Sequence, residues 1–306
     1  MPAWPPIGSY DEWSETCDTL HAHTQVLGKL AVRLAPPEPQ LQHAALRLTA
    51  RGWETSPLPA PDGSGSFLVA LDLRSHELVI EVSTGHSRRI TLVPNRPVGV
   101  VTGELLRAIS DLVGSVQIDP TPQEVPWTVP LDEDNDHARY DIDQVGSYFS
   151  AATDAALILA AFRAPYRGRS TPVNAWWGSF DLAVSLFSGL PATPPSNGFI
   201  MRNAMDAQEV AIGWWPGDQR SGQAAFYAYA HPAPENFAEG TITPPSAHWD
   251  PALGEFILYW DDVRDNTDPR AVGLEFFRSA FRHACLVCDW DPTLLASAEG
   301  KPPPVA

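Results

Sequence analysis

After a short proline-containing start, the chain carries a pattern of apolar positions typical of an amphipathic helix. Between Tyr10 and Leu34 apolar residues recur every three or four positions, beginning with Trp13, Cys17 and Leu20. Prolines follow within 36–39, and proline lacks the N–H group that would continue the helix. We therefore predict a helix over 10–34.

Short apolar runs with strand character come next. Residues 67–73, 77–82 and 89–93 are rich in Leu, Val and Ile, and only a few turn-forming residues separate them. This pattern predicts an antiparallel meander. The following residues predict a helix over 100–113 and a short strand over 116–118.

The composition changes between Pro120 and Asp136. Prolines recur there, and the acidic run Asp132-Glu133-Asp134-Asn135-Asp136 closes the segment. Such a segment is typical of a solvated, stiff connection. We predict a loop rather than a helix or strand.

Helical and strand-like patterns then return in the second half of the chain. A helical pattern covers 143–162, and a final helix runs from Pro269 to about Cys288 with Asp268 as its N-cap. The strand-like runs between these helices are 173–187, 209–215, 225–230 and 255–260.

Each half therefore predicts a helix, antiparallel strands and a helix. This order is typical of an α+β protein with two lobes, each an antiparallel sheet with helices on one face. We predict an N-terminal lobe at 1–119, a connection at 120–142, a Trp-rich C-terminal lobe at 143–290 and a frayed tail at 291–306.

The charge balance narrows the classes of partner. The 306 residues include 20 basic and 37 acidic side chains, a net charge of −17. An acidic protein is a poor match for nucleic acid or for an anionic membrane surface, because both attract basic patches. We expect neither as a partner.

The compartment follows from the start of the chain and from its cysteines. The first residues carry no cationic start and no apolar run of the signal-peptide kind, and the apolar stretch 155–162 is too short to span a bilayer. The three cysteines are too few for a disulfide framework. We expect a cytoplasmic protein.

Several groups of polar residues are candidates for chemistry. His21, Gln25 and Lys29 share one helix face, which either lines a cleft or is solvated. The pair Cys285 and Cys288 lacks further ligands at a zinc-site spacing, so we interpret both as packing residues and expect no metal.

Two carboxylates stand inside apolar strand patterns. Asp181 would share a strand face with Trp177 and Ser179, and Glu209 precedes an apolar run. A carboxylate in such a place must be paired or must have a raised pKa. Each is either a general base or a buried structural group.

The eleven tryptophans are many for this length, and six of them lie between positions 176 and 260. They indicate either core packing or an aromatic pocket for an apolar ligand. Loops that bind ATP or dinucleotides and the metalloprotease motif are absent from the sequence. We therefore expect no cofactor.

Long ordered motifs between Trp13 and Trp290 resemble a bacterial family known as domain of unknown function 5996. The resemblance rests on Thr24-Gln25-Val26-Leu27-Gly28-Lys29, Asp132-Glu133-Asp134 with His137, Trp177-Gly178-Ser179-Phe180-Asp181-Leu182-Ala183-Val184 with Phe187-Ser188-Gly189, Trp215-Pro216-Gly217, Ala225-Phe226-Tyr227-Ala228-Tyr229 and Gly254-Glu255-Phe256-Ile257-Leu258. The family brings no established activity.

The chain departs from the family pattern at three positions. The family has His where Asn174 and Gln208 stand, and Trp where His23 stands. Two titratable groups are thus replaced by amides, which form hydrogen bonds but ligate zinc poorly. If these positions line one pocket, they should lie within one ligand's reach of each other.

Together these features favour a small-molecule enzyme with an apolar, Trp-lined pocket, a cofactor-independent cyclase or isomerase in natural-product biosynthesis. A non-catalytic ligand-binding or interaction module and a hydrolase stay open as alternatives, as does a homodimer. We expect an apolar small molecule as the substrate. The candidate catalytic residues are Asp181, Glu209 and His23. The candidate substrate-binding residues are Gln25, Lys29, Asn174, Trp176, Trp177, Gln208, Trp214 and Trp215.

Overall fold

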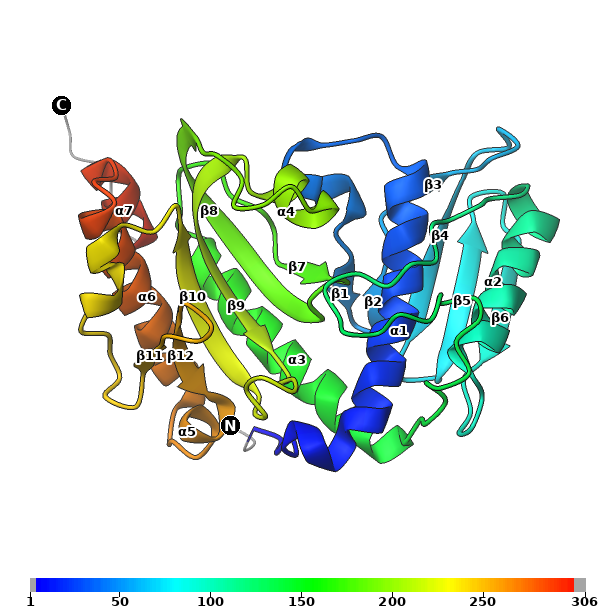
Figure 1. The fold of residues 1–306 in the computed structure, drawn as a ribbon, viewed down its shortest axis with the longest axis horizontal. Coiled ribbons are helices and arrows are strands. Elements are labelled where there is room, and N and C mark those ends of the chain that lie inside the picture. The colour runs from blue at the N-terminus through cyan, green and yellow to red at the C-terminus, as the bar shows by residue number, and fades with distance from the viewer. Residues whose placement is uncertain (1–3, 300–306) are drawn as a thin grey trace. The chain divides into compact units, whose positions relative to one another are not determined.

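The protein has an α+β fold with two antiparallel sheets (Figure 1). The structure is a computed structural model that describes residues 4–299. The chain forms two compact units. Unit 1 contains residues 4–9, 151–173 and the described residues from 182 onward, and unit 2 contains 10–150 and 174–181.

Unit 2 contains the first sheet and the helices that pack on it. Its strands follow the order β1-β2-β4-β5-β6, and β3 pairs with β4. The strands are β1 (Arg47–Thr49), β2 (Gly52–Glu54), β3 (Leu58–Pro59), β4 (Ser66–Asp72), β5 (Glu77–Val82) and β6 (Ser87–Thr91), and the helices are α1 (Tyr10–Leu34), the 3-10 helix η1 (Pro39–Ala44) and α2 (Val98–Val113). Strand β7 (Asn174–Trp176) also belongs to unit 2 but is not part of this sheet.

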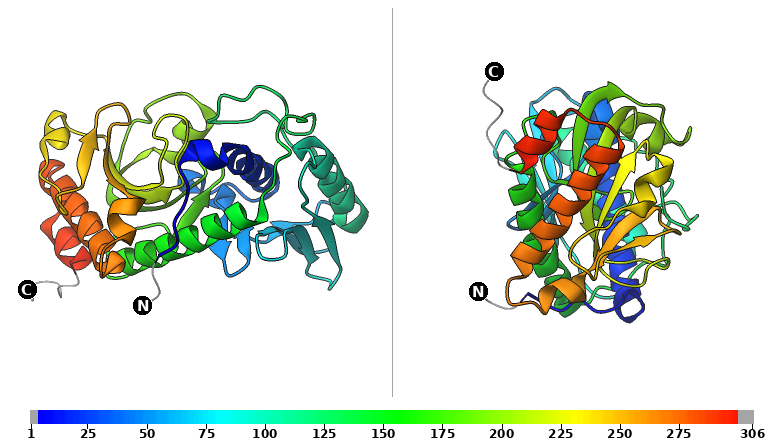
Figure 2. Two further views of the ribbon diagram at one scale, coloured as in Figure 1. Left: turned by 90° about the horizontal axis from the view of Figure 1, so that it is seen from below. Right: turned by 90° about the vertical axis from the view of Figure 1, so that its left-hand side faces the viewer.

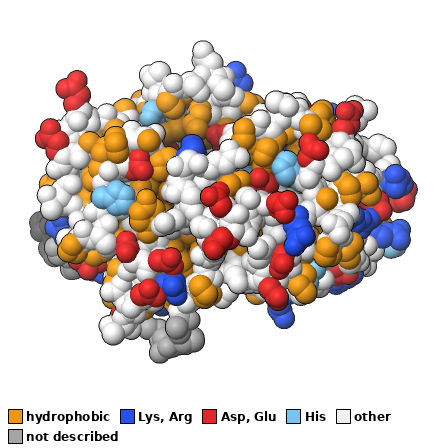
Figure 3. All heavy atoms as spheres, turned by 60° about the horizontal axis from the view of Figure 1, so that its bottom comes forward, with side chains coloured by type: hydrophobic (Ala, Val, Ile, Leu, Met, Phe, Trp, Pro, Cys, Tyr) orange, Lys and Arg blue, Asp and Glu red, His pale blue; other side chains and the backbone are white. Residues whose placement is uncertain are grey.

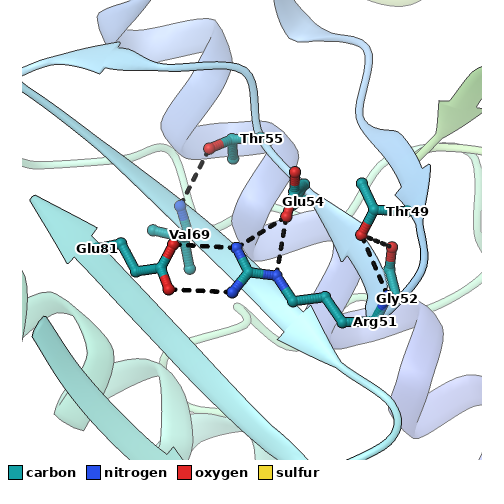
Figure 4. A network of polar contacts seen from close by, with 7 residues as sticks. All are labelled: Thr49, Arg51, Gly52, Glu54, Thr55, Val69 and Glu81. Atoms are coloured by element: carbon teal, nitrogen blue, oxygen red, sulfur yellow. Dashed lines mark hydrogen bonds and ion pairs between the residues drawn. The ribbon is translucent and has the colours of Figure 1, made fainter. Parts of the chain in front are cut away.

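Turn chemistry and a cross-strand ion network fix the register of this sheet. Asp72 Oδ1 accepts hydrogen bonds from the backbone N–H groups of Arg74 and Ser75, which closes the turn between β4 and β5. Arg51 donates to both oxygens of Glu81 and also to Glu54, so one guanidinium ties neighbouring strands together (Figure 4).

Unit 1 contains the second sheet, in which strands follow the order β11-β12-β10-β9-β8. These strands are β8 (Asp181–Pro191), β9 (Ala207–Trp215), β10 (Ala225–His231), β11 (His248–Asp250) and β12 (Glu255–Tyr259), and the helical elements are α4 (Phe199–Ala204), the 3-10 helix η2 (Glu235–Glu239), α5 (Trp260–Arg264), α6 (Pro269–Val287) and α7 (Pro292–Ala298). Asp268 caps α6 by accepting from Ala271 N, as predicted.

Helix α3 (Ile142–Arg163) begins in unit 2 and continues in unit 1. Within unit 1, α3 and α6 lie on the same side of the strands (Figure 2). Their aromatic side chains fill the core there: the ring of Phe277 lies 5.2 Å from that of Phe226 on β10 and 5.6 Å from that of Phe162 on α3. One face of the unit 1 sheet is therefore packed against helices.

Helix α3 is also the one described helix whose length and composition would allow it to cross a membrane. The sequence-based argument considered only 155–162, and the helix extends well beyond that stretch. Of its most apolar part, 44% is buried inside the structure, and core helices of globular proteins share this composition. The helix is thus weak evidence for a membrane span.

Two strand predictions differ from the structure. The predicted strand over 116–118 is wrong, because these residues pair with no strand and follow the helix-ending Gly114 as irregular backbone. The run 173–187 is not one strand: a turn over 177–180, with Phe180 at φ 58°, separates β7 from β8. Asp181 therefore begins a strand of its own and does not share a strand face with Trp177.

The division into units also differs from the predicted lobes at 1–119 and 143–290. The connection at 120–142 belongs to unit 2, and the segment 174–181 returns to that unit late in the chain.

Acidic side chains are spread over the surface drawn in Figure 3 rather than gathered in one patch.

Candidate functional site

The unit 1 sheet carries a buried carboxyl group on the face away from α3 and α6. Glu209 on β9 lies directly opposite Phe187 on β8 and His231 on β10, so the three side chains share one face. The side chain of Glu209 is only 4% exposed. A polar group has thus been placed inside an otherwise apolar strand, as the sequence indicated.

The surroundings of Glu209 keep its carboxyl group largely protonated below neutral pH. Burial raises the pKa of Glu209 to about 7, while a hydrogen bond from the Ser185 hydroxyl and the charge of Arg169 only partly oppose this. The guanidinium of Arg169 lies 3.9 Å from the centre of the Phe187 ring. At neutral pH this carboxyl group can both accept and donate a proton.

Aromatic side chains continue along the same face of the sheet. The Tyr227 ring packs over Gly213, where a Cβ atom would lie 2.3 Å from the ring, so only glycine leaves room for it. Trp215 and Tyr229 flank Tyr227 at ring distances of 5.7 and 6.1 Å. The buried Trp215 Nε1–H has no hydrogen-bond partner among the described residues, so it can still donate to a ligand.

Neighbouring candidates on β9 point to the other face, because side chains alternate along a strand. Trp214 packs in the helix-side core, 5.7 Å from the ring of Trp260. Gln208 is half-buried and accepts a hydrogen bond from Ser188 Oγ at 3.1 Å. Of these adjacent candidates, only Glu209 and Trp215 share the aromatic face.

In unit 2, the predicted row on α1 is buried rather than solvated. His21 Nε2 lies 2.9 Å from the backbone oxygen of Trp177, and Gln25 exchanges two hydrogen bonds of 2.9 Å with the backbone of Gln123. Lys29 is the third member, and its Nζ lies 5.5 Å from the centre of the Trp177 ring. The row anchors the segments around 123 and 177 to the helix.

His23 faces a second group of charged residues. The side chain is 2% exposed, and its Nδ1 atom has no hydrogen-bond partner among residues 4–299. Burial lowers the pKa of His23 to about 4, although the charge of Asp134 opposes this effect. The imidazole is therefore neutral at pH 7.

A carboxylate–imidazole pair lies beside His23. Asp134 Oδ2 accepts from His137 Nδ1 at 2.6 Å, and Asp134 Oδ1 accepts from the backbone N–H groups of Asp136 and His137. The Trp127 ring lies 4.4 Å from that of His137. Both residues stand in motifs of the family resemblance, but the acidic run was expected to be a solvated loop, whereas Asp134 is only 2% exposed.

The remaining candidates have local partners. Asn174 accepts from Arg47 and donates to Gln42 at 3.0 Å, and Trp176 on the same strand is half-buried. Asp181 accepts from the hydroxyl group of Ser179. These contacts are typical of structural hydrogen bonding.

The three positions that depart from the family pattern have different surroundings. His23 lies beside Asp134 and His137, while Asn174 bonds to Arg47 and Gln42, both in unit 2. Gln208 belongs to unit 1. Their expected gathering around one ligand stays a prediction.

Within residues 4–299, no group of three or more His, Cys, Asp or Glu side chains is arranged to hold a metal ion. Cys285 and Cys288 have free thiols at the end of α6, and burial raises the pKa of both. Cys285 lies on α6, as the sequence indicated, and is part of the core, whereas Cys288 is the C-cap residue that follows the helix.

A family model described as a family of unknown function (DUF5996) matches residues 4–297. The chain belongs to this family. Neither the curated proteins nor the solved structures contain a match. The family assignment therefore confirms the resemblance, and any function must be argued from the side chains of this chain.

Proposed function

We propose that the protein is a small-molecule enzyme that isomerises or cyclises an apolar substrate by proton transfer through Glu209. The observation that carries the proposal is the buried Glu209 carboxyl group with a pKa of about 7 on an aromatic sheet face. A carboxyl group with such a pKa can remove a proton and return it at neutral pH. A step that only moves a proton within one molecule needs no cofactor.

The same face suggests how the substrate is held. Glu209 and Trp215 are six residues apart on one strand, which corresponds to about 20 Å at ~3.3 Å per residue. A substrate that touches both is long, is apolar where it meets Tyr227 and Tyr229, and accepts a hydrogen bond from Trp215 Nε1. Holding a flexible chain in one reactive shape lowers the entropic part of the barrier.

The test adds the purified protein to an extract of cells of the source organism from which the gene has been deleted. The mass and the chromatographic retention time of each compound in the extract are then followed. Isomerisation and cyclisation by proton transfer leave the mass unchanged, so wild-type protein should shift one compound to a new retention time at constant mass. Glu209→Gln should abolish the shift. Glu235→Gln, at an exposed position of η2, is the matched control and should retain it.

The pH dependence provides a second measurement. If the Glu209 carboxylate is the base, the reaction rate should rise with pH and reach half of its maximum near pH 7, because that is the pKa of Glu209. Conversion that adds the mass of water would indicate a hydrolase and contradict the proposal. A compound that binds stoichiometrically but never changes would indicate a ligand-binding module instead.

A further inference from the structure

The Glu209 carboxyl group is closed off from solvent in the structure. The residue is only 4% exposed, so a substrate reaches the carboxyl group only if a neighbouring segment moves away from it. Segments with few anchoring contacts open most easily, because their movement breaks the fewest interactions.

Residues 192–206, which connect β8 to β9, are weakly anchored. None of these described residues is buried. The backbone N–H of Ala192 donates to the Asp206 oxygen at 2.9 Å, which closes the base of the segment as in an Ω-loop. The hydrogen bonds of 194–205 stay within the segment, as between Asn203 and the Phe199 oxygen. The segment can therefore move on its base while the strands stay paired.

Among the described residues, a single hydrogen bond ties this segment to β10. His231 Nε2–H donates to the backbone oxygen of Thr193 at 3.1 Å, and His231 lies directly opposite Glu209 on the same face of the sheet. The segment therefore bends over the start of β9 on the side that carries Glu209. Its other end is near as well, since the charge of Asp206 adds to the effect of burial on the pKa of Glu209.

Helix α4 lies within this segment and carries apolar side chains without burying any of them. Phe199, Ile200 and Met201 follow one another, so they point in three directions around the helix, and Phe199 and Met201 are exposed. A helix that is apolar all round is normally buried. Exposed apolar side chains that gather next to a buried polar group indicate a surface that covers a ligand.

We propose that residues 192–206 form a flap that opens to admit the apolar substrate to Glu209 and then closes over it, with Phe199 and Met201 as substrate contacts. That the ligand under the flap is the substrate rests on the proposed function. An apolar ligand removes these side chains from water, which favours the closed state once the ligand is bound. In the free protein, the bond from His231 to Thr193 holds the flap closed.

The first test measures binding of N-phenyl-1-naphthylamine, an apolar dye that gains fluorescence when it leaves water. In the double variant Phe199→Ser and Met201→Ser the affinity should fall at least about tenfold, because two apolar contacts are lost. Thermal stability should stay unchanged, since α4 buries no residue. The matched control, Leu157→Ser and Leu286→Ser, changes exposed positions on the helix side of the sheet and should bind the dye like wild type.

The second test measures the movement of the flap by limited digestion with trypsin. Arg202 is the only basic residue of the flap, so cleavage after it reports opening. His231→Ala removes the bond to Thr193 and should speed this cleavage roughly fivefold, the effect of losing one hydrogen bond. Dye at a concentration equal to its measured Kd should slow the cleavage of wild type about twofold, because half of the protein is then occupied. His248→Ala, at an exposed position of β11, is the matched control and should leave the rate unchanged.

Failure of this inference and failure of the proposed function appear in different measurements. The flap would be excluded if wild type did not bind the dye, or if the α4 variant bound it no more weakly than the leucine control. A rate of cleavage after Arg202 that did not respond to the dye or to His231→Ala would also overturn it. Unchanged conversion by Glu209→Gln would instead contradict the proposed proton transfer and leave the flap intact, because dye binding and cleavage need no turnover.

Discussion

Glu209 and Asp134 are both buried carboxyl groups, yet their pKa values move in opposite directions. Glu209 in unit 1 is 4% exposed and Asp134 in unit 2 is 2% exposed. Burial raises the pKa of each group. For Asp134, hydrogen bonds from the His137 side chain and from two backbone N–H groups outweigh burial and lower the pKa.

The hydrogen-bond donors around Asp134 set the direction of its pKa shift. A carboxylate that accepts several hydrogen bonds is stabilised in its charged form, whereas one with few donors retains its proton. Asp134 therefore stabilises a loop, and Glu209 is available for proton transfer. The following predictions test this comparison, beginning with the largest effect.

Removing the Asp134 charge should destabilise the fold strongly. In Asp134→Asn the amide cannot accept all three donors, and breaking a buried, hydrogen-bonded pair costs roughly 3–5 kcal/mol. Urea denaturation at pH 7 measures the loss. Asp136→Asn, at an exposed position two residues away, should change stability by less than ~0.5 kcal/mol. Similar losses in both variants would show that the donors around Asp134 matter little.

Glu209 should instead make the protein less stable as pH rises from 4.5 to 7. The folded pKa of about 7 exceeds the ordinary glutamate pKa of 4.5, so the native state binds more protons in this window than the unfolded state. The contribution lost over the window is at most ~3 kcal/mol. The stability of Glu209→Gln relative to wild type should therefore rise with pH across this range. If the difference in stability between Glu209→Gln and wild type did not change with pH, Glu209 would be solvated.

His23 should give the opposite slope in unit 2. Its folded pKa of about 4 lies below the ordinary histidine pKa of 6.5, so the unfolded state binds more protons between these values. Wild-type stability should fall as pH drops from 6.5 to 4, by at most ~3 kcal/mol. Denaturation of His23→Gln over this range should lack that fall. If the stability of His23→Gln and of wild type fell in parallel with pH, burial would not keep the imidazole neutral.

A smaller effect should follow from filling the space beside the Asp134 loop. At Gly99 on α2 a Cβ atom would lie 2.9 Å from Asp134 N and 3.0 Å from Asp132 O, both of which are backbone atoms. We expect Gly99→Ala to cost ~1–3 kcal/mol. Gly103→Ala, on the same helix with open space around it, should stabilise by ~0.5–1 kcal/mol, as thermal unfolding can measure. Equal stability of the two variants would show that the loop is free to move.

The sequence predicted those parts of the fold that depend on local pattern. The first helix was predicted with its observed bounds, Tyr10–Leu34, because the apolar period and the prolines act within a few residues. The strand expected over 116–118 does not form, because a strand needs a partner that no local pattern guarantees. Asp181 was misplaced because a turn at Phe180 interrupts the apolar run, and no proline in the sequence marks that turn.

The sequence predicted some residues of the candidate site but not the contacts that the other residues make. Glu209 stood out as a lone carboxylate in an apolar strand, and the alternation of a strand then separates Trp215 from Trp214. The acidic run with His137 was noted but interpreted as a solvated loop. The burial of Asp134 was not predicted, because its backbone donors belong to a loop whose shape no periodicity encodes. Burial of Lys29 likewise depends on Trp177, about 150 residues away along the chain.

The late return of Asn174–Asp181 to unit 2 has a consequence for synthesis of the protein on the ribosome. The first 150 residues emerge before Trp177, whose backbone oxygen bonds to His21 and whose ring lies near Lys29. Until that segment leaves the exit tunnel, His21 and Lys29 on the nascent helix α1 lack their contacts with Trp177. A chain that stalls before residue 174 would therefore present these side chains to chaperones and proteases, whereas a chain that reaches Asp181 would not.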